Sequence, residues 1–149
     1  MTTDGKTESV VVGVDGSPSA AAALKWAAHY AQATGATIRA VLAWHYPAAA
    51  GSPPVGVTPP TVEAEVERTR DAIIDEAVAG ALGPQPPVKI ERTAVYGHPA
   101  QVLIDESARA DLLVVGSRGH GGFTGMLLGS VSTHCVTHAH CPVAVVRAG

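Results

Sequence analysis

The residues best suited to chemistry lie in a glycine-rich segment near the C-terminal end of the sequence. Glycine occupies positions 116, 119, 121, 122, 125 and 129, and Ser130 follows the last of them. The segment comes after an apolar run and before a helical pattern. Glycine lets the backbone approach an anion closely, and the first N–H groups of a helix point at incoming oxygens. These residue types predict an anion site, with phosphate as the expected anion.

Two common phosphate-binding loops are excluded by the spacing. A Walker A loop requires Gly-Lys-Ser/Thr after its glycines, and the segment contains no such triplet. The turn after the first apolar run, at residues 14–17, lacks the G-x-G-x-x-G pattern of dinucleotide-binding folds. From the residues alone, a connection that uses glycine only for its turns stays open as the alternative.

Two charged residues near these segments each have two interpretations. Asp15 follows the first apolar run, where it either contacts a ligand or fixes the turn into the next helix. Arg118 lies inside the glycine-rich segment, where it either pairs with phosphate or is solvated.

A second cluster of reactive side chains follows the glycine-rich segment and consists of His134, Cys135, His138, His140 and Cys141. His134 and His138 are four residues apart, a spacing that can bind zinc on one helix face. No carboxylate lies nearby in the sequence, and the cysteines lie on either side of a predicted change from helix to strand. We therefore predict no metal site and no disulfide.

Two further histidines are candidates for general bases. His98 is better placed to cap a helix, and His120 lies in a glycine-rich loop. No Ser/His/Asp arrangement can be recognised from the spacing, so we predict no catalytic residue.

Five short apolar runs alternate with longer helical patterns along the chain. The predicted strands cover residues 10–14, 37–44, 88–95, 112–116 and 142–146. The predicted helices cover residues 18–34, 62–82, 99–108 and 130–139. Ser17 is the expected N-cap of the first helix. The expected apolar stripe of the second helix consists of Val62, Val66, Ile73 and Ala77.

This alternation predicts an α/β fold with an open, mostly parallel five-stranded sheet and helices on both faces, that is, a Rossmann-like architecture. Ligands of such sheets bind beyond the carboxyl ends of the strands, where the strand order reverses. The residues after Val14, Trp44 and Val115 are therefore expected to lie together. The third strand alternates apolar and polar residues, so it is expected at a sheet edge or with one face half covered. The last strand begins at Pro142 and is expected at a sheet edge.

The composition limits the class of protein. With 149 residues, 46% of them hydrophobic and 15% charged, the chain is expected to form one domain over residues 1–149. Residues 1–8 form a polar tail and residues 47–61 a proline-rich loop. The net charge of −3 argues against nucleic-acid binding. Because the chain shows neither a membrane-length apolar stretch nor a signal peptide, a cytoplasmic protein without membrane contact is expected.

Five segments of the sequence together resemble the universal stress protein family. The first is the spacing G-x2-G-x9-G-S, at Gly116, Gly119, Gly129 and Ser130. The others are VVVGVDGS at residues 10–17, GHP at 97–99, ADLLVVGS at 110–117 and CPVAVV at 141–146. They occur in the family's order and cover nearly the whole chain outside the tail and the proline-rich loop. The glycine spacing is similar to the nucleotide motif of the family's ATP-binding members, which have an adenine nucleotide alpha hydrolase-like fold.

The resemblance implies a set of ligand contacts and an assembly. The phosphate-contacting positions would be Gly116, Gly119, Gly129, Ser130, Val131 and Ser132. Arg118, inside the same segment, stays a candidate phosphate contact on its charge and position. Asp15 would lie beside the adenine and ribose, and the backbone of Ala43 would read the adenine. The implied cofactor is ATP with Mg²⁺, and the implied partner is a second copy of the chain, paired through the C-terminal strand.

The function implied by the resemblance is that of a nucleotide-responsive regulatory protein of the stress response. Two alternatives stay open: a slow ATPase or nucleotidyl-transfer enzyme on the same fold, and a protein that binds cyclic AMP or another adenosine ligand. The sequence offers no evident base or arginine finger for hydrolysis, so any turnover is expected to be slow.

Overall fold

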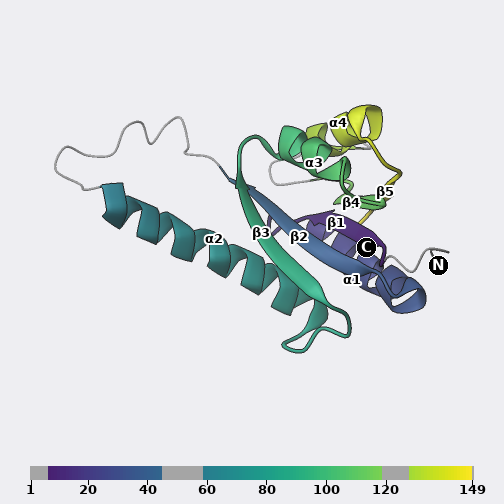
Figure 1. The fold of residues 1–149 in the computed structure, drawn as a ribbon, viewed down its shortest axis with the longest axis horizontal. Helices are drawn as coiled ribbons and strands as arrows, with labels where there is room; N and C mark the ends of the chain where they lie inside the picture. The colour runs from purple at the N-terminus through teal and green to yellow at the C-terminus, as the bar shows by residue number, and fades with distance from the viewer. Residues whose placement is uncertain (1–6, 45–58, 119–127, 149) are drawn as a thin grey trace.

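The computed structural model describes residues 7–44, 59–118 and 128–148, with only the backbone described for residues 59–66. Strands and helices alternate along the chain (Figure 1). The strands are β1 (Ser9–Gly13), β2 (Thr37–Trp44), β3 (Ile90–Tyr96), β4 (Leu112–Gly116) and β5 (Val143–Val146). The helices are α1 (Pro18–Thr34), α2 (Pro59–Leu82), α3 (Pro99–Ser107) and α4 (Ser130–His138).

The five strands form one parallel sheet in the order β3-β2-β1-β4-β5. Strands β2 and β3 lie on one side of β1, and strands β4 and β5 lie on its other side. The order therefore reverses between β1 and β4, which are direct neighbours with Val12 opposite Val114. This confirms the predicted α/β fold, and it places β3 and β5 at the two edges, as expected from their sequences.

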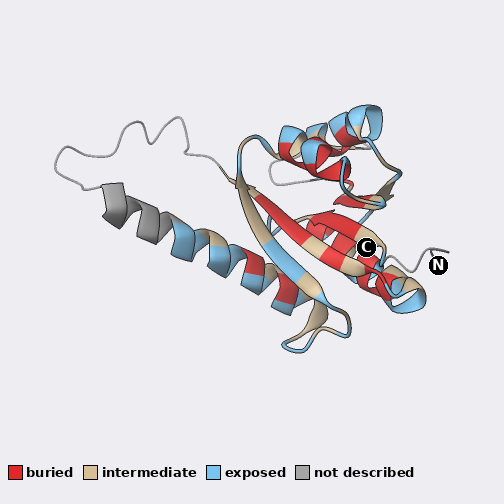
Figure 2. Ribbon diagram, in the orientation of Figure 1, coloured by how far each residue is buried: buried red, intermediate tan, exposed pale blue. Residues whose placement is uncertain are grey.

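Two hydrophobic clusters cover the two faces of the sheet. Val10, Val12 and Val14 point to the face covered by α1 and α2, whereas Val11 points to the face covered by α3 and α4. This follows from the period of two in a strand. Figure 2 shows buried residues concentrated in the central strands and in the helix surfaces that pack on them. The fold thus has three layers, with helices on both faces of the sheet.

Helix α1 begins and ends where its sequence predicts. The Ser17 side chain accepts a hydrogen bond of 3.2 Å from the N–H of Ala20, and Pro18 occupies the first turn, where its missing N–H costs nothing. Gly35 ends the helix with a φ of 78°, in the left-handed region that favours glycine. Alanine lines the buried side of α1, so the helix lies close to the sheet.

Helix α2 differs from its prediction in its start and in its buried stripe. It begins at Pro59, so residues 59–61 belong to the helix and not to the predicted loop, since proline is tolerated in a first helical turn. Among the α2 residues whose side chains are described, Ile74 (2% exposed) and Val78 are buried, and Ala77 of the predicted stripe packs partly buried against the core. Ile73, also expected in the stripe, is 36% exposed. Val62 and Val66 of the stripe, and residues 47–58 of the predicted loop, lie outside the residues described at this level.

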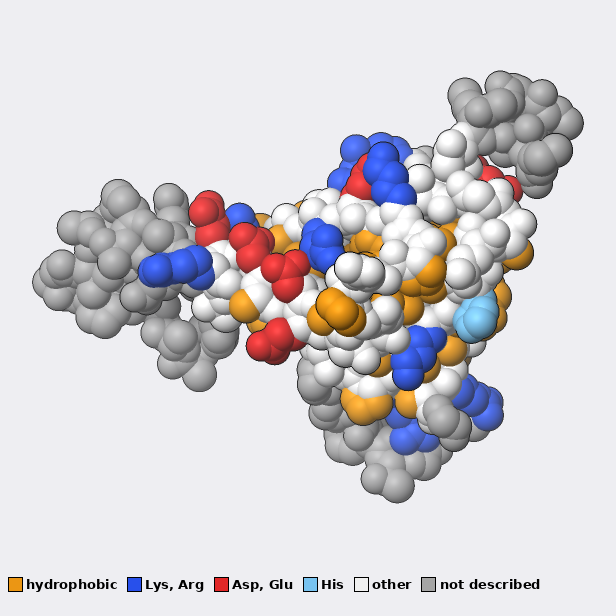
Figure 3. All heavy atoms as spheres, turned by 90° about the horizontal axis from the view of Figure 1, so that it is seen from below, with side chains coloured by type: hydrophobic (Ala, Val, Ile, Leu, Met, Phe, Trp, Pro, Cys, Tyr) orange, Lys and Arg blue, Asp and Glu red, His pale blue; other side chains and the backbone are white. Residues whose placement is uncertain are grey.

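The bounds of β2 and β4 match their predictions, and the bounds of β1, β3, β5, α3 and α4 differ by one or two residues. Strand β3 covers Ile90–Tyr96 and β5 begins at Val143, one residue after the proline. None of the helices in the described part of the chain combines the length and hydropathy needed to cross a membrane. Figure 3 shows acidic side chains gathered along α2, where Glu67, Asp71 and Asp75 are exposed on one stripe.

Candidate functional site

The carboxyl ends of β1 and β4 lie side by side where the strand order reverses. The backbone N–H of Val14 donates to the carbonyl of Val41 on β2, which extends the sheet to the last residue before the β1–α1 turn. On the other side, the N–H of Ser117 donates to the carbonyl of Val146 on β5 at 2.7 Å. The two segments predicted to do chemistry therefore leave the sheet from adjacent strands, as expected for a ligand site in this fold class.

Gly116 is required by the close approach of α1. A Cβ atom at this position would lie 2.6 Å from both the backbone carbon and the Cβ of Ser19, in the first turn of α1. Contacts under 3.0 Å with backbone atoms cannot be relieved by rotating a side chain. The absence of a side chain at Gly116 thus lets the N-terminus of α1 lie against the end of β4, and it brings the β1–α1 turn toward the glycine-rich segment.

Asp15 shapes the turn between β1 and α1. Its Oδ1 accepts a hydrogen bond of 2.8 Å from the N–H of Ser17, and Gly16 between them has a φ of 80°. This arrangement is an Asx-turn, so the turn-forming interpretation of Asp15 is confirmed. The Asp15 side chain is exposed beyond the carboxyl end of β1. The turn role and a ligand contact are compatible, since a carboxylate has several acceptor positions.

The start of α4 differs from the start of α1 in its cap, which is a glycine and not a serine. Its N-cap is Gly129, and among the described residues no side-chain hydrogen bond caps the helix. The first backbone bond into the helix is donated by Thr133 to the carbonyl of Gly129. The N–H groups of Ser130, Val131 and Ser132 precede it and have no acceptor within the helix. They lie together at the positive end of the helix dipole, which favours an anion.

Ser117 and Ser132 close the base of the glycine-rich segment. The carbonyl of Ser117 accepts from the N–H of Gly129 at 2.6 Å and from the hydroxyl of Ser132 at 3.1 Å. The same hydroxyl lies 3.0 Å from the carbonyl of Gly129. Ser132 is buried, so its side chain serves the loop closure and its backbone N–H is what it could offer a ligand. Sequence analysis did not single out Ser117; its position directly after Gly116 in the family-like motif was the available signal.

Of the remaining predicted site residues, some lie at the carboxyl ends of other strands and some lie outside the described residues. Ala43 is half-buried one residue before the end of β2, opposite Val95 on β3. Arg118 is exposed. Gly119 and the rest of the predicted loop through residue 127 lie outside the described residues, as does His120. The structure thus gathers Asp15, Gly116 and the start of α4 around the β1–β4 junction, while Ala43 lies one strand away.

Two aromatic side chains lie at the carboxyl ends of β2 and β3, on the same side of the sheet as the candidate site. Trp44 and Tyr96 face each other at the strand ends, with ring centroids 5.0 Å apart and nearly perpendicular rings. The guanidinium carbon of Arg70 on α2 lies 5.1 Å from the centroid of the Trp44 ring, within cation–π range. These contacts hold α2 against the strand ends, and sequence analysis did not identify them.

The reactive side chains near α4 do not provide a nucleophile. Cys135 is fully buried, and burial raises the pKa of its thiol from 9.0 to about 11, so the thiolate is scarce at neutral pH. Burial also raises the pKa of Cys141, and the Asp111 carboxylate acts in the same direction. Within the described residues, no three or more His, Cys, Asp or Glu side chains are arranged to hold a metal ion. His98 occupies the N-cap of α3, as predicted, but makes no side-chain cap hydrogen bond.

The sequence matches a known protein family over nearly its whole length. A family model described as the universal stress protein family matches residues 6–147. A universal stress protein of Mycolicibacterium smegmatis is 42% identical over 138 residues, which make up 93% of this chain and 45% of that protein. The chain spans about half the length of the curated relatives it matches.

Two solved structures show the same fold over nearly their whole length. UspA of Lactobacillus plantarum has a TM-score of 0.67 and 27% identity, and the match covers 95% of this chain and 99% of UspA. A universal stress protein solved in complex with cAMP has a TM-score of 0.63 and 28% identity, with 96% of this chain and 98% of that protein covered.

Proposed function

The chain belongs to the universal stress protein family, and from this premise we propose that it is a nucleotide-responsive regulatory protein that binds an adenine nucleotide. ATP with Mg²⁺ is the proposed physiological ligand. The observation that carries the proposal is the start of α4, where the N–H groups of Ser130, Val131 and Ser132 follow a glycine cap. They are available to phosphate oxygens at the β1–β4 junction.

The described residues support a division of roles across the site. We assign phosphate binding to the α4 N–H groups, with Gly129 as a cap that brings no side chain to them. Gly116 contributes by letting α1 lie close to the end of β4. Gly119, which lies outside the described residues, is proposed as a phosphate contact from the glycine spacing alone. Arg118, exposed and next to this segment, supplies a cation that can pair with phosphate. We assign the base and ribose to the side of the site formed by Asp15 and by the backbone of Ala43.

A magnesium ion fits this division. Mg²⁺ usually keeps several waters and binds through one or two carboxylates plus substrate phosphates. Asp15 supplies an exposed carboxylate at the carboxyl end of β1, beside the start of the glycine-rich segment. When bound, the ion would neutralise phosphate charge. The proposed ligand for it on this chain is Asp15.

A charge substitution at Ser130 tests the phosphate site. Ser130→Asp and Ser130→Asn place side chains of nearly equal size at an exposed position in the first turn of α4. An aspartate there is compatible with the helix dipole, so the fold should persist. Its charge should repel phosphate and weaken ATP binding at least about tenfold, which is 1.4 kcal/mol. Isothermal titration calorimetry of ATP with Mg²⁺ measures the effect. Equal affinities of the two variants would place the phosphates elsewhere.

The identity of the nucleotide is a separate question with its own measurement. The solved relative in complex with cAMP motivates a cyclic-nucleotide alternative for this chain. A calorimetric series with ATP, ADP, AMP and cyclic AMP separates the two. If α4 holds a terminal phosphate chain, affinity should decrease from ATP to AMP. Tighter binding of cyclic AMP than of ATP would favour the alternative.

We further propose that the protein holds ATP far better than it hydrolyses it. Backbone N–H groups bind phosphates already present in the ground state, and such uniform binding gives affinity without rate. Turnover should stay well below about 1 s⁻¹, the low end for ordinary enzymes. The measurement is ADP release at saturating ATP and Mg²⁺, with Asp15→Ala for comparison. Ordinary enzymatic turnover that is lost in Asp15→Ala would instead identify an ATPase.

A further inference from the structure

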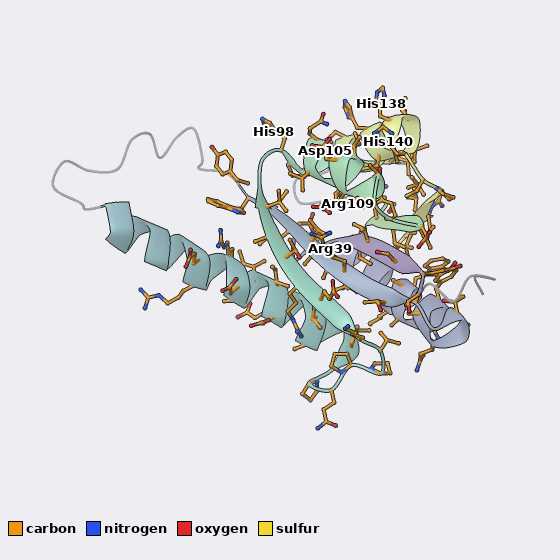
Figure 4. All side chains as sticks on the ribbon, viewed as in Figure 1. Arg39, His98, Asp105, Arg109, His138 and His140 are labelled. Carbon is orange, nitrogen blue, oxygen red and sulfur yellow. The ribbon has the colours of Figure 1, made fainter. Side chains whose placement is uncertain are left out.

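An open depression lies between α3 and α4 and is lined by four histidines. It has a volume of about 620 Å³. His134 and His138 contribute from α4, His98 from the N-cap of α3 and His140 from the segment before β5. In Figure 4 the labelled His98, Asp105, His138 and His140 all belong to the α3–α4 layer, on one side of the sheet. The sequence contains seven histidines, so this depression collects more than half of them.

The ring of His134 is held in one tautomer. Its Nδ1 lies 2.8 Å from the backbone carbonyl oxygen of Ser130. A carbonyl can only accept a hydrogen bond, so Nδ1 must carry the proton and donate. In the neutral ring the lone pair is then on Nε2. Metal-binding histidines are commonly oriented in this way, because a hydrogen bond at one ring nitrogen fixes the ring and raises the basicity of the other.

His138 lies one helical turn further along the same face of α4. The two ring centroids are 6.3 Å apart with the planes tilted by 34°, and both residues are exposed. Exposed side chains change rotamer rapidly, so a bound ion can draw the His138 ring toward the fixed His134 ring without moving the helix. Asp105, on α3, accepts a hydrogen bond from Gln101, which lines the depression, and adds a negative charge beside it.

We propose that His134 and His138 form a two-histidine binding site for a divalent transition-metal ion, with water completing its coordination. Imidazole nitrogens favour copper, nickel and zinc, whereas magnesium and calcium prefer oxygen. The prediction from sequence alone was of no metal, because it found no carboxylate and no suitable cysteine near the pair. In the tertiary structure His98 and His140 line the same depression, and the Asp105 carboxylate lies beside it. The proposed coordination uses only the two α4 histidines, so it does not depend on the cysteines.

Nickel binding to the nucleotide-free full-length chain tests the proposal, since nucleotides themselves bind nickel. Isothermal titration calorimetry with NiCl₂ in a non-coordinating buffer should show one saturable site. His134→Gln and His138→Gln should each weaken binding by at least about tenfold. His29→Gln is the matched control, because His29 is an exposed histidine on α1, away from the depression. It should leave the affinity unchanged.

Thermal unfolding gives a second measurement on the same variants. Nickel should raise the unfolding temperature of the unsubstituted chain and of His29→Gln, because a ligand that binds only the folded state stabilises it. The rise should disappear in the His134→Gln/His138→Gln double variant, whose exposed substitutions should leave the fold intact. Undiminished nickel binding by that double variant, or absence of saturable binding by the unsubstituted chain, would overturn the proposal.

Discussion

Gly116 and Gly80 are two glycines outside the left-handed region whose surroundings are opposite. A Cβ at Gly116 would lie 2.6 Å from backbone and side-chain atoms of Ser19, while a Cβ at Gly80, in helix α2, would meet nothing within 4 Å. Gly116 is thus needed for packing at the candidate site. Gly80 only adds conformational freedom to the unfolded chain, which costs the helix stability.

Alanine substitutions at these two glycines should therefore change stability in opposite directions. We expect Gly116→Ala to lower the free energy of unfolding by about 1–3 kcal/mol, as overpacking of a filled site does. Gly80→Ala should raise it by about 0.5–1 kcal/mol. Urea unfolding followed by circular dichroism measures both. A Gly116→Ala protein as stable as the unsubstituted chain would mean that α1 does not lie so close to β4.

The buried thiol of Cys135 should make stability depend on alkaline pH. The folded-state pKa of about 11 exceeds the ordinary value of 9.0, so the folded protein holds this proton more tightly than the unfolded chain. The resulting stability is fully present below pH 9 and is lost as the pH rises toward 11. We expect the free energy of unfolding to fall between pH 8 and pH 10.

The Cys135→Ala variant isolates this contribution to the pH dependence. It should be less stable at pH 8 because of the cavity, yet its stability should fall less between pH 8 and pH 10. Some dependence should remain, since the pKa values of Cys141 and Tyr30 are also raised. An unchanged pH dependence in Cys135→Ala would assign the effect to other groups.

Helix α3 is joined to the sheet by a buried charge as well as by apolar packing. The Oε2 atom of Glu106 lies 3.0 Å from a guanidinium nitrogen of Arg39 on β2, and also 3.0 Å from one of Arg109, which follows the C-cap of α3. The Glu106 side chain is 7% exposed, compared with 26% for Arg39 and 68% for Arg109. The bond to Arg39 connects two elements that are far apart in sequence, and Figure 4 labels both arginines.

The two partners of Glu106 should contribute unequally to stability. Arg39→Ala leaves the buried Glu106 charge without its partner on β2 and should cost about 1–3 kcal/mol. Arg109→Ala removes a solvent-exposed partner and should cost about 0–1 kcal/mol. Chemical denaturation of both variants gives the comparison. Equal losses would show that the two ion pairs of Glu106 matter alike, contrary to this burial argument.

The molecule as a whole presents two sheet edges of different character. The β3 edge carries the charged residues Glu91 and Arg92, and Arg92 pairs with Asp75 of α2. The β5 edge, Val143–Val146, has no charged residue and pairs within the described chain only with β4. Charged residues discourage pairing between chains, and an apolar open edge permits it. Family membership and this contrast together support a proposed homodimer through β5.

Dimer formation through β5 can be tested without a substitution. Light scattering at micromolar concentration should give the mass of two chains. Hydrogen exchange at high and low protein concentration should show β5 amides that lose protection on dilution, while β3 amides do not. A monomer mass, or protection of β5 that is independent of concentration, would contradict the proposed interface.

Much of the architecture was determined by the sequence through local patterns. Continuous apolar runs predicted strands buried on both faces, and Ser17, Pro18 and Gly35 predicted the ends of α1. The glycine spacing at residues 116–130 predicted an anion site between a strand and a helix. These signals are readable because each depends on residues close together in the chain, where backbone geometry and hydrophobic periodicity act directly.

The tertiary structure alone decided which side chains meet. The sequence could not show that Ser19 lies against Gly116, that Ser132 closes the loop through Ser117, or that His98 faces the α4 histidines. Nor could the sequence show that Ile74 of α2 is buried in the core while its neighbour Ile73, which is equally hydrophobic, is exposed. The physical reason is the same in each case. Such contacts depend on the rotation of a helix against the sheet and on the strand order, which are set by the packing of distant segments.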